Sequence, residues 1–307
     1  FMRDAFASQL ILEARKNPDI ILVTGDLGYG VFDDFEKEFP NQYLNVGVAE
    51  QNMTSIATGL SLEGKKVFTY SIANFATLRC LEQIRNDAAY HEANLTIVAI
   101  GGGFTYGSLG MSHHATEDIA IMRALPNIEV IVPGTDWETT QATRILSSRD
   151  GVSYLRLEKD GKNYNLVGNK SFKIGKSNTY KKGKDVTIIT SGGILEECMK
   201  AADILGQSKI TCQVISMHTV KPIDKNSIYK SAKNSKLIVS VEEHNQNGGL
   251  GSAISEVLSV SNINFKMKMI AINDIYFSIV GDQGYLRKKN KLDSISISRK
   301  IINYLKK

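Results

Sequence analysis

The sequence contains little cysteine and little proline, and it lacks any long apolar run. Its 307 residues include 3 cysteines, 5 prolines and 1 tryptophan. Cys80, Cys198 and Cys212 are odd in number and form no Cys-x-x-Cys pair, which argues against a disulfide framework and favours a reduced, cytoplasmic protein. No stretch of about 18 apolar residues occurs and no secretory leader is recognised, so we expect no membrane span and no membrane partner.

Several motifs that mark common enzyme classes are also missing. No Gly-x-Gly-x-x-Gly opens a helix directly after the first predicted strand, and no P-loop occurs, which argues against dinucleotide and P-loop nucleotide sites. The sequence has no His-x-x-x-His, no cluster of Cys and His, and no Gly-x-Ser-x-Gly nucleophile elbow. We therefore predict that this chain supplies no metal ligands of its own.

The charge balance is only modestly basic. The net charge is +5 and the sequence pI is about 8.9, with the basic excess late in the chain, at 181–184, 287–291 and 299–307. No stripe of basic residues interleaved with aromatic residues accompanies this excess. The pattern is typical of solvated faces, and we expect no nucleic-acid partner.

Short β-rich runs alternate regularly with helical patterns along the whole chain. Such alternation predicts parallel sheets covered by helices on both faces, and the length favours about two domains. The polar segment 163–184, rich in Lys, Asn, Gly and Ser, indicates a connection between them. The predicted fold class is therefore α/β, with two doubly wound domains: a parallel-sheet domain over 1–175 and a smaller α/β domain over 183–307.

The predicted elements follow in chain order. Predicted strands are 20–24, 43–48, 66–70, 95–100, 128–132, 152–157, 185–190, 210–216, 236–241 and 265–272. Predicted helices are 3–16, 50–62, 74–90, 116–125, 136–148, a helix ending at 205, 251–258 and 294–305. Within the helix 50–62, the spacing of Met53, Ile56 and Leu60 predicts one buried face.

Polar and aromatic residues collect where predicted strands of the first domain end. Asp26 follows the first strand, Glu50 the second, Phe75 the third, and the glycine-rich run 101–110 leads to His113 and its neighbour. In open parallel sheets, ligands bind at the carboxyl ends of strands. Each residue alone has a structural interpretation as a cap, a core aromatic or a loop histidine, but their shared position makes a functional site the better interpretation.

Four segments resemble transketolases, in order and over nearly the whole chain. "GDLGYGVFDDF" (25–35), the segment 45–87 containing "VGVAEQNM" and "YSIANFATLRCLEQIRND", and "MSHHATEDIAIMRALPNIEVIVP" (111–133) resemble the pyrimidine-binding domain. "VSVEEHNQNGGLGSAISEVL" (239–258) resembles the C-terminal domain. The resemblance implies a thiamine-diphosphate enzyme that transfers a two-carbon ketol unit from a ketose to an aldehyde.

This resemblance assigns expected roles to the residues at the strand ends. Glu50 matches the glutamate that contacts the aminopyrimidine of the cofactor, and shielding a carboxyl group from water helps it to share a proton with the ring. Phe75 matches the aromatic residue that packs on the aminopyrimidine, with Ile72 beside it, and Asp26 matches an aspartate near the thiazolium. His113 matches a loop histidine that contacts substrate oxygens.

The resemblance also implies a partner chain. Full-length transketolases hold the diphosphate and its metal in a preceding domain marked by Gly-Asp-Gly, which this sequence lacks. The chain therefore resembles the C-terminal half of a split transketolase. A separate N-terminal subunit is expected to hold Mg²⁺ or Ca²⁺ and to share thiamine diphosphate in an α2β2 assembly.

The residues expected at the sugar-phosphate end depart from the family pattern. Arg3 matches one phosphate-binding arginine, but Lys159 stands near the position of the other, and Lys lacks the bidentate fork of Arg. Gly101 occupies a histidine position, and Leu109 replaces an aspartate that reads a sugar hydroxyl. We expect small-molecule sugar substrates with an atypical acceptor.

Two other interpretations remain open from the sequence. "VAEQ" also occurs in relatives such as the beta subunits of 2-oxoacid dehydrogenases and deoxyxylulose-phosphate synthase. A non-catalytic α/β scaffold subunit that has kept the fold is the alternative of a different class, although the retained Glu50 argues against it.

Overall fold

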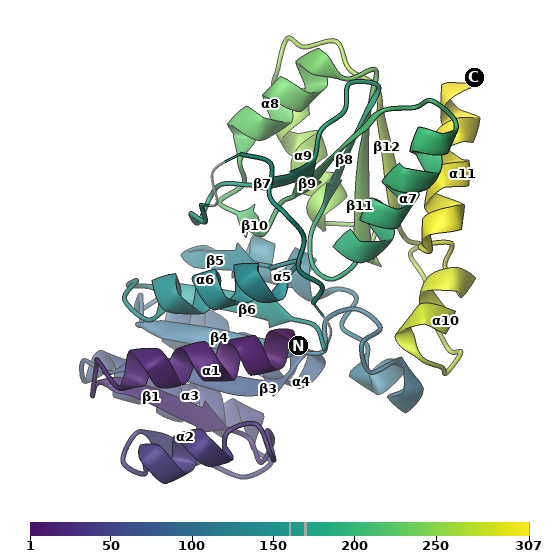
Figure 1. Ribbon diagram of the computed structural model, residues 1–307. Helices are drawn as coiled ribbons and strands as arrows, with labels where there is room; N and C mark the ends of the chain where they lie inside the picture. The colour runs from purple at the N-terminus through teal and green to yellow at the C-terminus, as the bar shows by residue number, and fades with distance from the viewer. Residues whose placement is uncertain (160, 169–170, 307) are drawn as a thin grey trace.

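Two β-sheets organise the chain, one in each half (Figure 1). The computed structural model describes residues 1–159, 161–168 and 171–306. The first sheet has the strand order β10-β5-β6-β4-β3-β1-β2 and the second β12-β11-β8-β9-β7. Within the described residues, neighbouring strands pair in parallel except β10 with β5 and β7 with β9. The predicted α/β fold with two parallel-dominated sheets is confirmed.

The elements have the following bounds. The strands are β1 (Ile20–Thr24), β2 (Tyr43–Asn45), β3 (Lys66–Ile72), β4 (Leu95–Ile100), β5 (Ile128–Ile131), β6 (Val152–Leu157), β7 (Asn178–Lys181), β8 (Val186–Thr190), β9 (Cys212–Ser216), β10 (Thr219–Lys221), β11 (Leu237–Asn245) and β12 (Met267–Ile272). The α-helices are α1 (Met2–Ala14), α2 (Asp33–Glu38), α3 (Glu50–Leu62), α4 (Ala73–Thr77), α5 (Asp118–Ala124), α6 (Asp136–Leu146), α7 (Leu195–Gln207), α8 (Lys225–Asn234), α9 (Leu250–Ser259), α10 (Gln283–Lys289) and α11 (Ser294–Leu305). A π-helix η1 (Gln83–Ala89) and the 3₁₀ turns η2 (Gly107–Leu109) and η3 (Met111–His113) complete them.

Helices cover both faces of the first sheet. Strands such as β1 and β4 are buried along their whole length, as expected of strands covered on two sides. Helices α1 and α6 pack on one face, where Phe6 and Leu10 meet Leu22. Helix α3, η1 and α5 pack on the other, where Met53 and Ile84 lie in one core. Because the helices cover the two faces of the sheet, a functional site can form at the carboxyl ends of the parallel strands.

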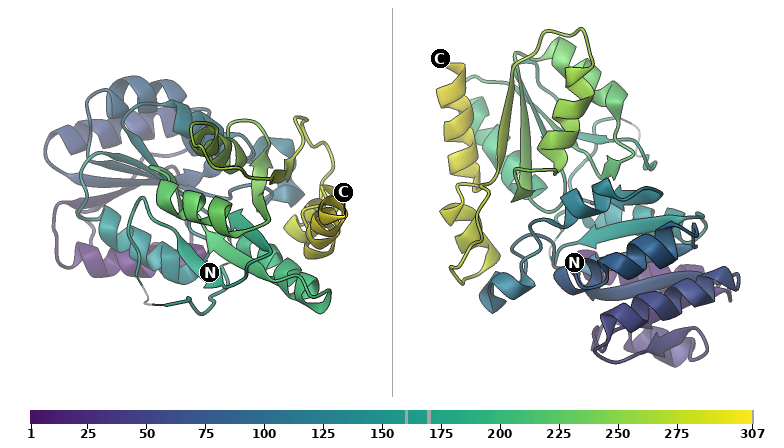
Figure 2. Two further views of the ribbon diagram at one scale, coloured as in Figure 1. Left: turned by 90° about the horizontal axis from the view of Figure 1, so that it is seen from above. Right: turned by 180° about the vertical axis from the view of Figure 1, so that it is seen from behind.

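The second sheet is covered in the same way. Helices α7 and α11 pack on one face through residues that include Leu195 and Ile297. Helices α8 and α9 pack on the other through Ile228 and Ile254, which belong to the same apolar core as α3 and α5 of the first domain. Figures 1 and 2 show that this second domain packs against the β10–β5 edge of the first sheet. The two domains therefore share a continuous core.

Several predicted elements are confirmed and others are wrong. The strands at 20–24, 95–100 and 152–157 and the helix at 50–62 appear with those bounds. The helix predicted at 74–90 is wrong as one element, because α4 ends at Thr77 and the chain turns before η1. The π-helical segment η1 buries Ile84, Ala88 and Ala89.

The buried face predicted for α3 is also partly wrong. Met53 is fully buried, but Ile56 and Leu60 are only half-buried. Small and hydroxyl side chains fill the face instead, with Thr54 and Thr58 each donating a hydrogen bond to the carbonyl four residues earlier. Because these hydroxyls are satisfied within the helix, they can be buried without a partner from another element.

The predicted connection 163–184 contains a strand that was not predicted. Strand β7 lies in this segment and pairs antiparallel with β9 at the edge of the second sheet. Strand β10, within the predicted second domain, crosses to pair with β5 in the first sheet. Helices α2, α8 and α10 were also not predicted. The domain bounds 1–175 and 183–307 stay predictions. Strand β10 lies within the second of these ranges but pairs in the sheet of the first.

A buried ion cluster joins the two domains. Arg156, on β6, is 2% exposed and donates hydrogen bonds to Asp118 Oδ2 at 2.8 Å and to the carbonyl of Glu243 at 3.2 Å. Glu158 and Glu243 both accept from Arg287 of α10. Burial and the neighbouring Glu243 charge raise the pKa of Glu158. The cluster fixes β6, β11 and α10 relative to one another.

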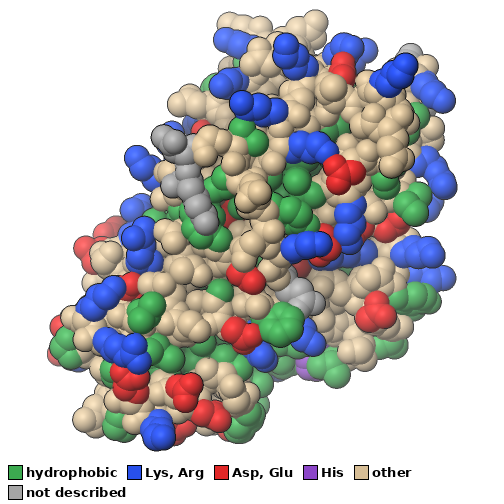
Figure 3. Space-filling view, in the orientation of Figure 1, with side chains coloured by type: hydrophobic (Ala, Val, Ile, Leu, Met, Phe, Trp, Pro, Cys, Tyr) green, Lys and Arg blue, Asp and Glu red, His purple; other side chains and the backbone are tan. Residues whose placement is uncertain are grey.

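On the surface drawn in Figure 3, Lys and Arg side chains are scattered over both domains among acidic ones. Among the described residues, that face carries no continuous basic stripe. Within the same residues, no helix combines the length and apolar character needed to cross a membrane.

Candidate functional site

Glu50 opens helix α3 at the carboxyl edge of the first sheet. Its side chain is only 2% exposed, and Arg79 Nη1 donates a hydrogen bond to Glu50 Oε2 at 2.7 Å. Gly25, directly after β1, packs so closely that a Cβ there would lie 3.6 Å from Glu50 Cγ. The positive end of the α3 dipole and the Arg79 cation together stabilise a carboxylate at this buried position.

The aromatic ring of Phe75 lies beside this ion pair. Arg79 Cζ stands 4.5 Å from the centroid of the Phe75 ring, a cation–π geometry. On another side, the rings of Phe75 and His113 have centroids 5.1 Å apart and planes at 63°. Glu50, Arg79, Phe75 and His113 therefore form one connected group, which we call the Glu50 cluster.

A hydrogen bond holds the histidine loop against α4. The side-chain amide of Asn74 donates to the carbonyl of Ser112 at 2.7 Å, and the Ser112 hydroxyl lies 3.1 Å from His113 Nδ1. His113 is half-buried, whereas the next residue, His114, is 5% exposed and packs edge-to-face on Phe104. Burial lowers the pKa of His114. The structure thus distinguishes an accessible histidine from a neutral, packed one.

Asp26 lies next to Gly25, on the wall that packs against Glu50. Its carboxylate accepts hydrogen bonds from the Tyr29 hydroxyl at 2.6 Å and from Asn45 Nδ2 at 3.2 Å, and these bonds lower the pKa of Asp26. Its backbone has φ of 59°, held by a hydrogen bond from its N–H to Asn45 Oδ1. This fixed turn keeps the Asp26 carboxylate half-buried at the mouth of the site.

The other predicted residues lie around the same edge but outside the Glu50 cluster. Ile72 ends β3, half-buried, and directly precedes the helix that carries Phe75. Arg3 is on α1, pairs with Asp4 at 3.0 Å, and lies close enough to Tyr106 for its charge to lower the pKa of that phenol against the larger effect of burial. Lys159 is exposed just after β6.

Arg79 is the residue that sequence reasoning missed. It stands four positions after Phe75, the spacing at which side chains meet along a helix. A buried glutamate also needs a cation or hydrogen-bond donors, so a search for the partner of Glu50 would have found it. Tyr29 and Asn45, which hold Asp26, were missed as well because they stand in a turn and at a strand end.

Cys80 lies close to the Glu50 cluster but is not suited to nucleophilic chemistry. Its thiol is fully buried and contacts the Phe75 carbonyl at 3.3 Å. Burial raises the pKa of the Cys80 thiol to about 11. It therefore remains a neutral thiol near pH 7.

A cavity of about 510 Å³ opens beside the Glu50 cluster. Its walls come from α4, the histidine loop and a loop of the second domain: Asn74, Leu78, Met111, His114, Thr116, Glu117, Ile121, Tyr276 and Phe277. Leu78, Met111 and Tyr276 on its rim are 44%, 53% and 79% exposed. Exposed apolar side chains that gather beside a polar site indicate a surface that binds another molecule.

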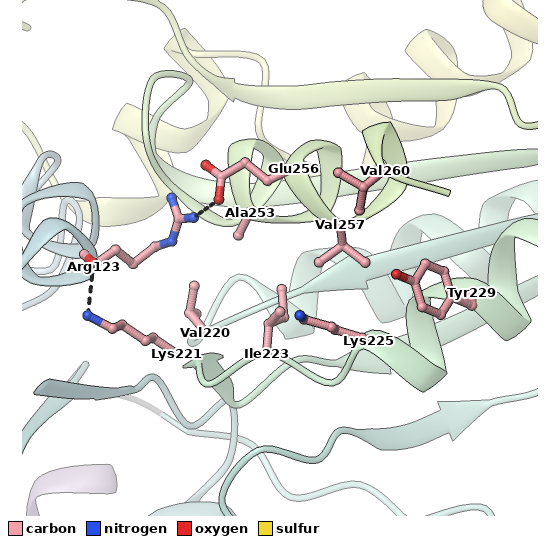
Figure 4. A pocket seen from close by; sticks show the side chains of 10 residues that line it. All are labelled: Arg123, Val220, Lys221, Ile223, Lys225, Tyr229, Ala253, Glu256, Val257 and Val260. Atoms are coloured by element: carbon pink, nitrogen blue, oxygen red, sulfur yellow. Dashed lines mark hydrogen bonds and ion pairs between the residues drawn. The ribbon is translucent and has the colours of Figure 1, made fainter. Parts of the chain in front are cut away.

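A second cavity, of about 360 Å³, lies between α5 and helices α8 and α9 (Figure 4). Three of its charged groups already have partners, since Arg123 donates to Glu256 Oε2 at 2.6 Å and Lys221 donates to the Arg123 carbonyl at 3.1 Å. Lys221 also donates to the Leu125 carbonyl. These contacts tie α5 to the second domain, so we interpret this cavity as a gap in domain packing.

Across the part of the chain that the structure describes, no group of three or more His, Cys, Asp or Glu side chains is arranged to hold a metal ion.

Comparisons with known proteins agree along the chain. Residues 1–163 match the family described as "Transketolase, pyrimidine binding domain", and residues 175–283 match "Transketolase, C-terminal domain". A Methanocaldococcus jannaschii protein named for a transketolase C-terminal section is 38% identical over 100% of this chain and 96% of its own length. A Phocaeicola vulgatus protein named as a subunit of apulose-4-phosphate transketolase is 33% identical over 99% of this chain and 97% of its own length.

Longer relatives and solved structures match as well. Human transketolase is 32% identical over 89% of this chain, which spans 44% of the human protein. A solved structure described as "Split gene transketolase, inactive beta4 tetramer" superposes with a TM-score of 0.87 at 33% identity, covering 97% of this chain and 95% of that one. Transketolase from Campylobacter jejuni shares the fold with a TM-score of 0.82 at 19% identity, over 98% of this chain and 46% of that one.

Proposed function

Because this chain belongs to the transketolase family, we propose that it is the C-terminal subunit of a split transketolase, which transfers a two-carbon ketol unit from a ketose to an aldehyde. The observation that carries the proposal is the position of Glu50. A single buried carboxylate, 2% exposed, opens α3 and pairs with Arg79, which lies over the Phe75 ring, and that ring in turn contacts His113. The full-length similarity to proteins named as transketolase subunits supports it.

The residues present fit thiamine diphosphate. The group that now satisfies Glu50 and Phe75 is a planar guanidinium, which donates an N–H to the carboxylate while it stacks on the ring. An aminopyrimidine is likewise planar and carries N–H donors, so the same two side chains suit it. Glu50 and Phe75, with Ile72 beside them, would hold the aminopyrimidine, and Asp26 would lie near the thiazolium. When bound, the cofactor supplies the electron sink for breaking the ketose carbon–carbon bond.

The chain's own residues do three things at this site. Glu50 accepts a hydrogen bond at Oε2 in a place where bulk water does not compete, so the bond is stronger than at the surface. Phe75 orients a planar group above it. His113, half-buried, stands at the opening where its imidazole would meet substrate oxygens.

We further propose that an N-terminal subunit completes the site in an α2β2 assembly in the cytoplasm. That partner would hold the diphosphate and Mg²⁺ or Ca²⁺, for which this chain offers no cluster among its described residues. Relatives of nearly the same length are named as subunits, which supports a partner. The apolar rim of Leu78, Met111 and Tyr276 is the surface that such a partner would cover.

The acceptor sugar is proposed to be atypical. Lys159 is exposed beyond β6 and supplies one positive charge without the bidentate fork of Arg. Two relatives are named for unusual sugars, apulose 4-phosphate and 6-deoxy-6-sulfo-D-fructose, and both match 97% or more of this chain. A ketose donor tested against a panel of phosphorylated, sulfonated and unphosphorylated aldehydes would identify the preferred class, and preference for erythrose or ribose phosphate would contradict the proposal.

Reconstitution tests the function itself. The chain is mixed with a candidate N-terminal transketolase subunit from the same source and assayed for ketol transfer with and without thiamine diphosphate and Mg²⁺. We expect turnover that requires both chains and both additions. Full activity of this chain alone would contradict the split-subunit proposal, and oxidation of pyruvate in place of ketol transfer would favour a 2-oxoacid dehydrogenase subunit.

A further inference from the structure

We propose that Arg79 occupies the aminopyrimidine position of the free chain and has to leave it before thiamine diphosphate can bind. The inference rests on the proposed function, because it concerns the same pocket. It adds an inhibitory contact within this chain, which must be displaced when the cofactor binds.

The geometry places the Arg79 guanidinium on both groups that would hold the ring. Arg79 Nη1 is 2.7 Å from Glu50 Oε2, the length of a charge-assisted hydrogen bond. Arg79 Cζ is 4.5 Å from the Phe75 ring centroid. One planar group thus makes a hydrogen bond to the acid and a cation–π contact with the aromatic ring at the same time.

The two occupants exclude each other. A guanidinium is flat, delocalised and rich in N–H donors, so it makes with an acid and an aromatic face the contacts that an aminopyrimidine would make. Glu50 Oε2 and the face of Phe75 that Arg79 covers cannot serve both groups at the same time. Binding of the cofactor therefore requires that Arg79 give up both contacts.

The solvent exposure of Glu50 and Arg79 indicates which side chain moves when the cofactor binds. Glu50 is 2% exposed and fixed in the first turn of α3, whereas the Arg79 side chain is 46% exposed. Arg79 also stands in the turn between α4 and η1, outside either helix. Its long side chain can rotate into water, where the guanidinium is well solvated, without disturbing the sheet or the core.

A consequence is that the free chain holds a closed pocket. The chain is in equilibrium between an Arg79-in state and an Arg79-out state, and only the second binds the cofactor. The apparent affinity is then reduced by the fraction of chains in the open state. The ion pair also spares the free chain the cost of an unpaired buried carboxylate.

The test uses the full chain and thiamine, which carries the aminopyrimidine but needs no diphosphate site from a partner. Thiamine affinity is measured by isothermal titration for the wild type, Arg79→Ala, Arg79→Gln and the control Arg144→Ala. Arg144 is an exposed arginine on α6 that donates a hydrogen bond to its helix neighbour Gln141. Arg79→Gln keeps a donor for Glu50 without the charge, so it guards against misfolding of the smaller variant.

We expect Arg79→Ala to bind thiamine about tenfold more tightly than the wild type, equivalent to about 1.4 kcal/mol. Arg79→Gln should fall between them, and Arg144→Ala should match the wild type. In the wild-type chain, the Arg79 Nε–Hε NMR signal, assigned by its loss in Arg79→Gln, should shift as thiamine is added. Adding Glu50→Gln to Arg79→Ala should weaken binding again, which shows that the gain arises in this pocket.

Three results would overturn the inference. Equal affinity of the wild type and Arg79→Ala, with Glu50→Gln weakening both, would leave the proposed function standing and remove the inhibitory role. Weaker binding by Arg79→Ala would make Arg79 a residue that assists the cofactor. No thiamine binding by any variant, together with no thiamine-diphosphate dependence of the reconstituted complex, would overturn both the inference and the proposed function.

Discussion

The ring of His113 packs against the ring of Phe75, with centroids 5.1 Å apart. The contact joins the loop after β4 to the helix after β3, two segments that are separate in the sequence and meet only at the carboxyl edge of the sheet. His114, one residue later, points into the protein and packs on Phe104. Adjacent histidines therefore have different surroundings and should have different roles.

Replacing each histidine by asparagine separates those roles. In the reconstituted complex, His113→Asn should lower kcat/KM by about 10²-fold, because it removes an imidazole proposed to act as general acid or base at the opening of the site, and should leave the thermal midpoint of unfolding unchanged. His114→Asn should lower the midpoint with a smaller effect on kcat/KM, since it disturbs a buried contact. Equal effects on kcat/KM would contradict this division.

The sequence predicted the positions of the site residues better than their contacts. Asp26, Glu50, Phe75 and His113 could be placed at one sheet edge because each follows a recognisable apolar strand. Arg79 was missed although it stands four positions after Phe75, because the chain leaves α4 after Thr77 and the contact of its guanidinium with Glu50 depends on how that turn packs. A long side chain's destination depends on tertiary packing, which local periodicity does not encode.

The ion cluster between the domains should dominate stability. Arg156 is buried with Asp118 at 2.8 Å and Glu158 at 3.5 Å, so Arg156→Met would leave carboxylates buried without their cation. We expect the free energy of unfolding, from urea titration, to fall by about 3–5 kcal/mol. The control Arg149→Ala removes the pair with Glu129, whose side chains are 44% and 20% exposed, and should cost about 0.2–1 kcal/mol. Similar losses of unfolding free energy for the two variants would contradict the dominant role of the buried ion cluster.

His218 should make the fold sensitive to acid. It is fully buried against Phe172, with ring centroids 4.0 Å apart, and burial lowers the pKa of His218 from 6.5 to about 3. The folded chain then binds fewer protons than the unfolded chain between these values, so this stability is complete above pH 6.5 and is lost as the pH falls toward 3. Between pH 6.5 and about 5 the loss should be about 2 kcal/mol.

The variant His218→Phe isolates that contribution. Phenylalanine keeps the stacking surface toward Phe172 but cannot be protonated. Urea unfolding at pH 7 and pH 5 should show that the wild type loses about 2 kcal/mol more than the variant over this interval. Parallel losses in the two proteins would mean that other groups cause the acid sensitivity.

The apolar rim should govern assembly. Tyr276 is 79% exposed at the mouth of the larger cavity, and Tyr276→Lys would place a charge where the partner is proposed to pack. We expect at least about a tenfold weaker association with the N-terminal subunit, measured by analytical ultracentrifugation. Val260, 81% exposed beside the cavity of Figure 4, provides the matched control. If Val260→Lys weakens association as much as Tyr276→Lys does, the proposed surface is wrong.

The fold was predictable where short strands are rich in apolar residues. Strands β1, β4 and β6 are buried on both sides and have their predicted bounds. Strand β7 was hidden in a polar segment because it lies at a sheet edge with alternating burial, and β10 because its three residues carry no periodic signal. Edge strands and short exchanged strands depend on the neighbouring domain for their pairing, which the local sequence does not specify.

The central claim is that the Glu50 carboxyl group takes part in ketol transfer. Turnover of the Glu50→Gln variant tests this claim most directly. Glutamine keeps the size of the side chain and can still accept the Arg79 hydrogen bond, so the thermal midpoint should stay close to that of the wild type. In the reconstituted complex at saturating thiamine diphosphate, kcat should fall by about 10²–10⁴-fold, because the side chain can no longer share a proton. The control Glu36→Gln, on the exposed surface of α2, should retain full activity. Wild-type turnover by a folded, cofactor-loaded Glu50→Gln complex would contradict the account.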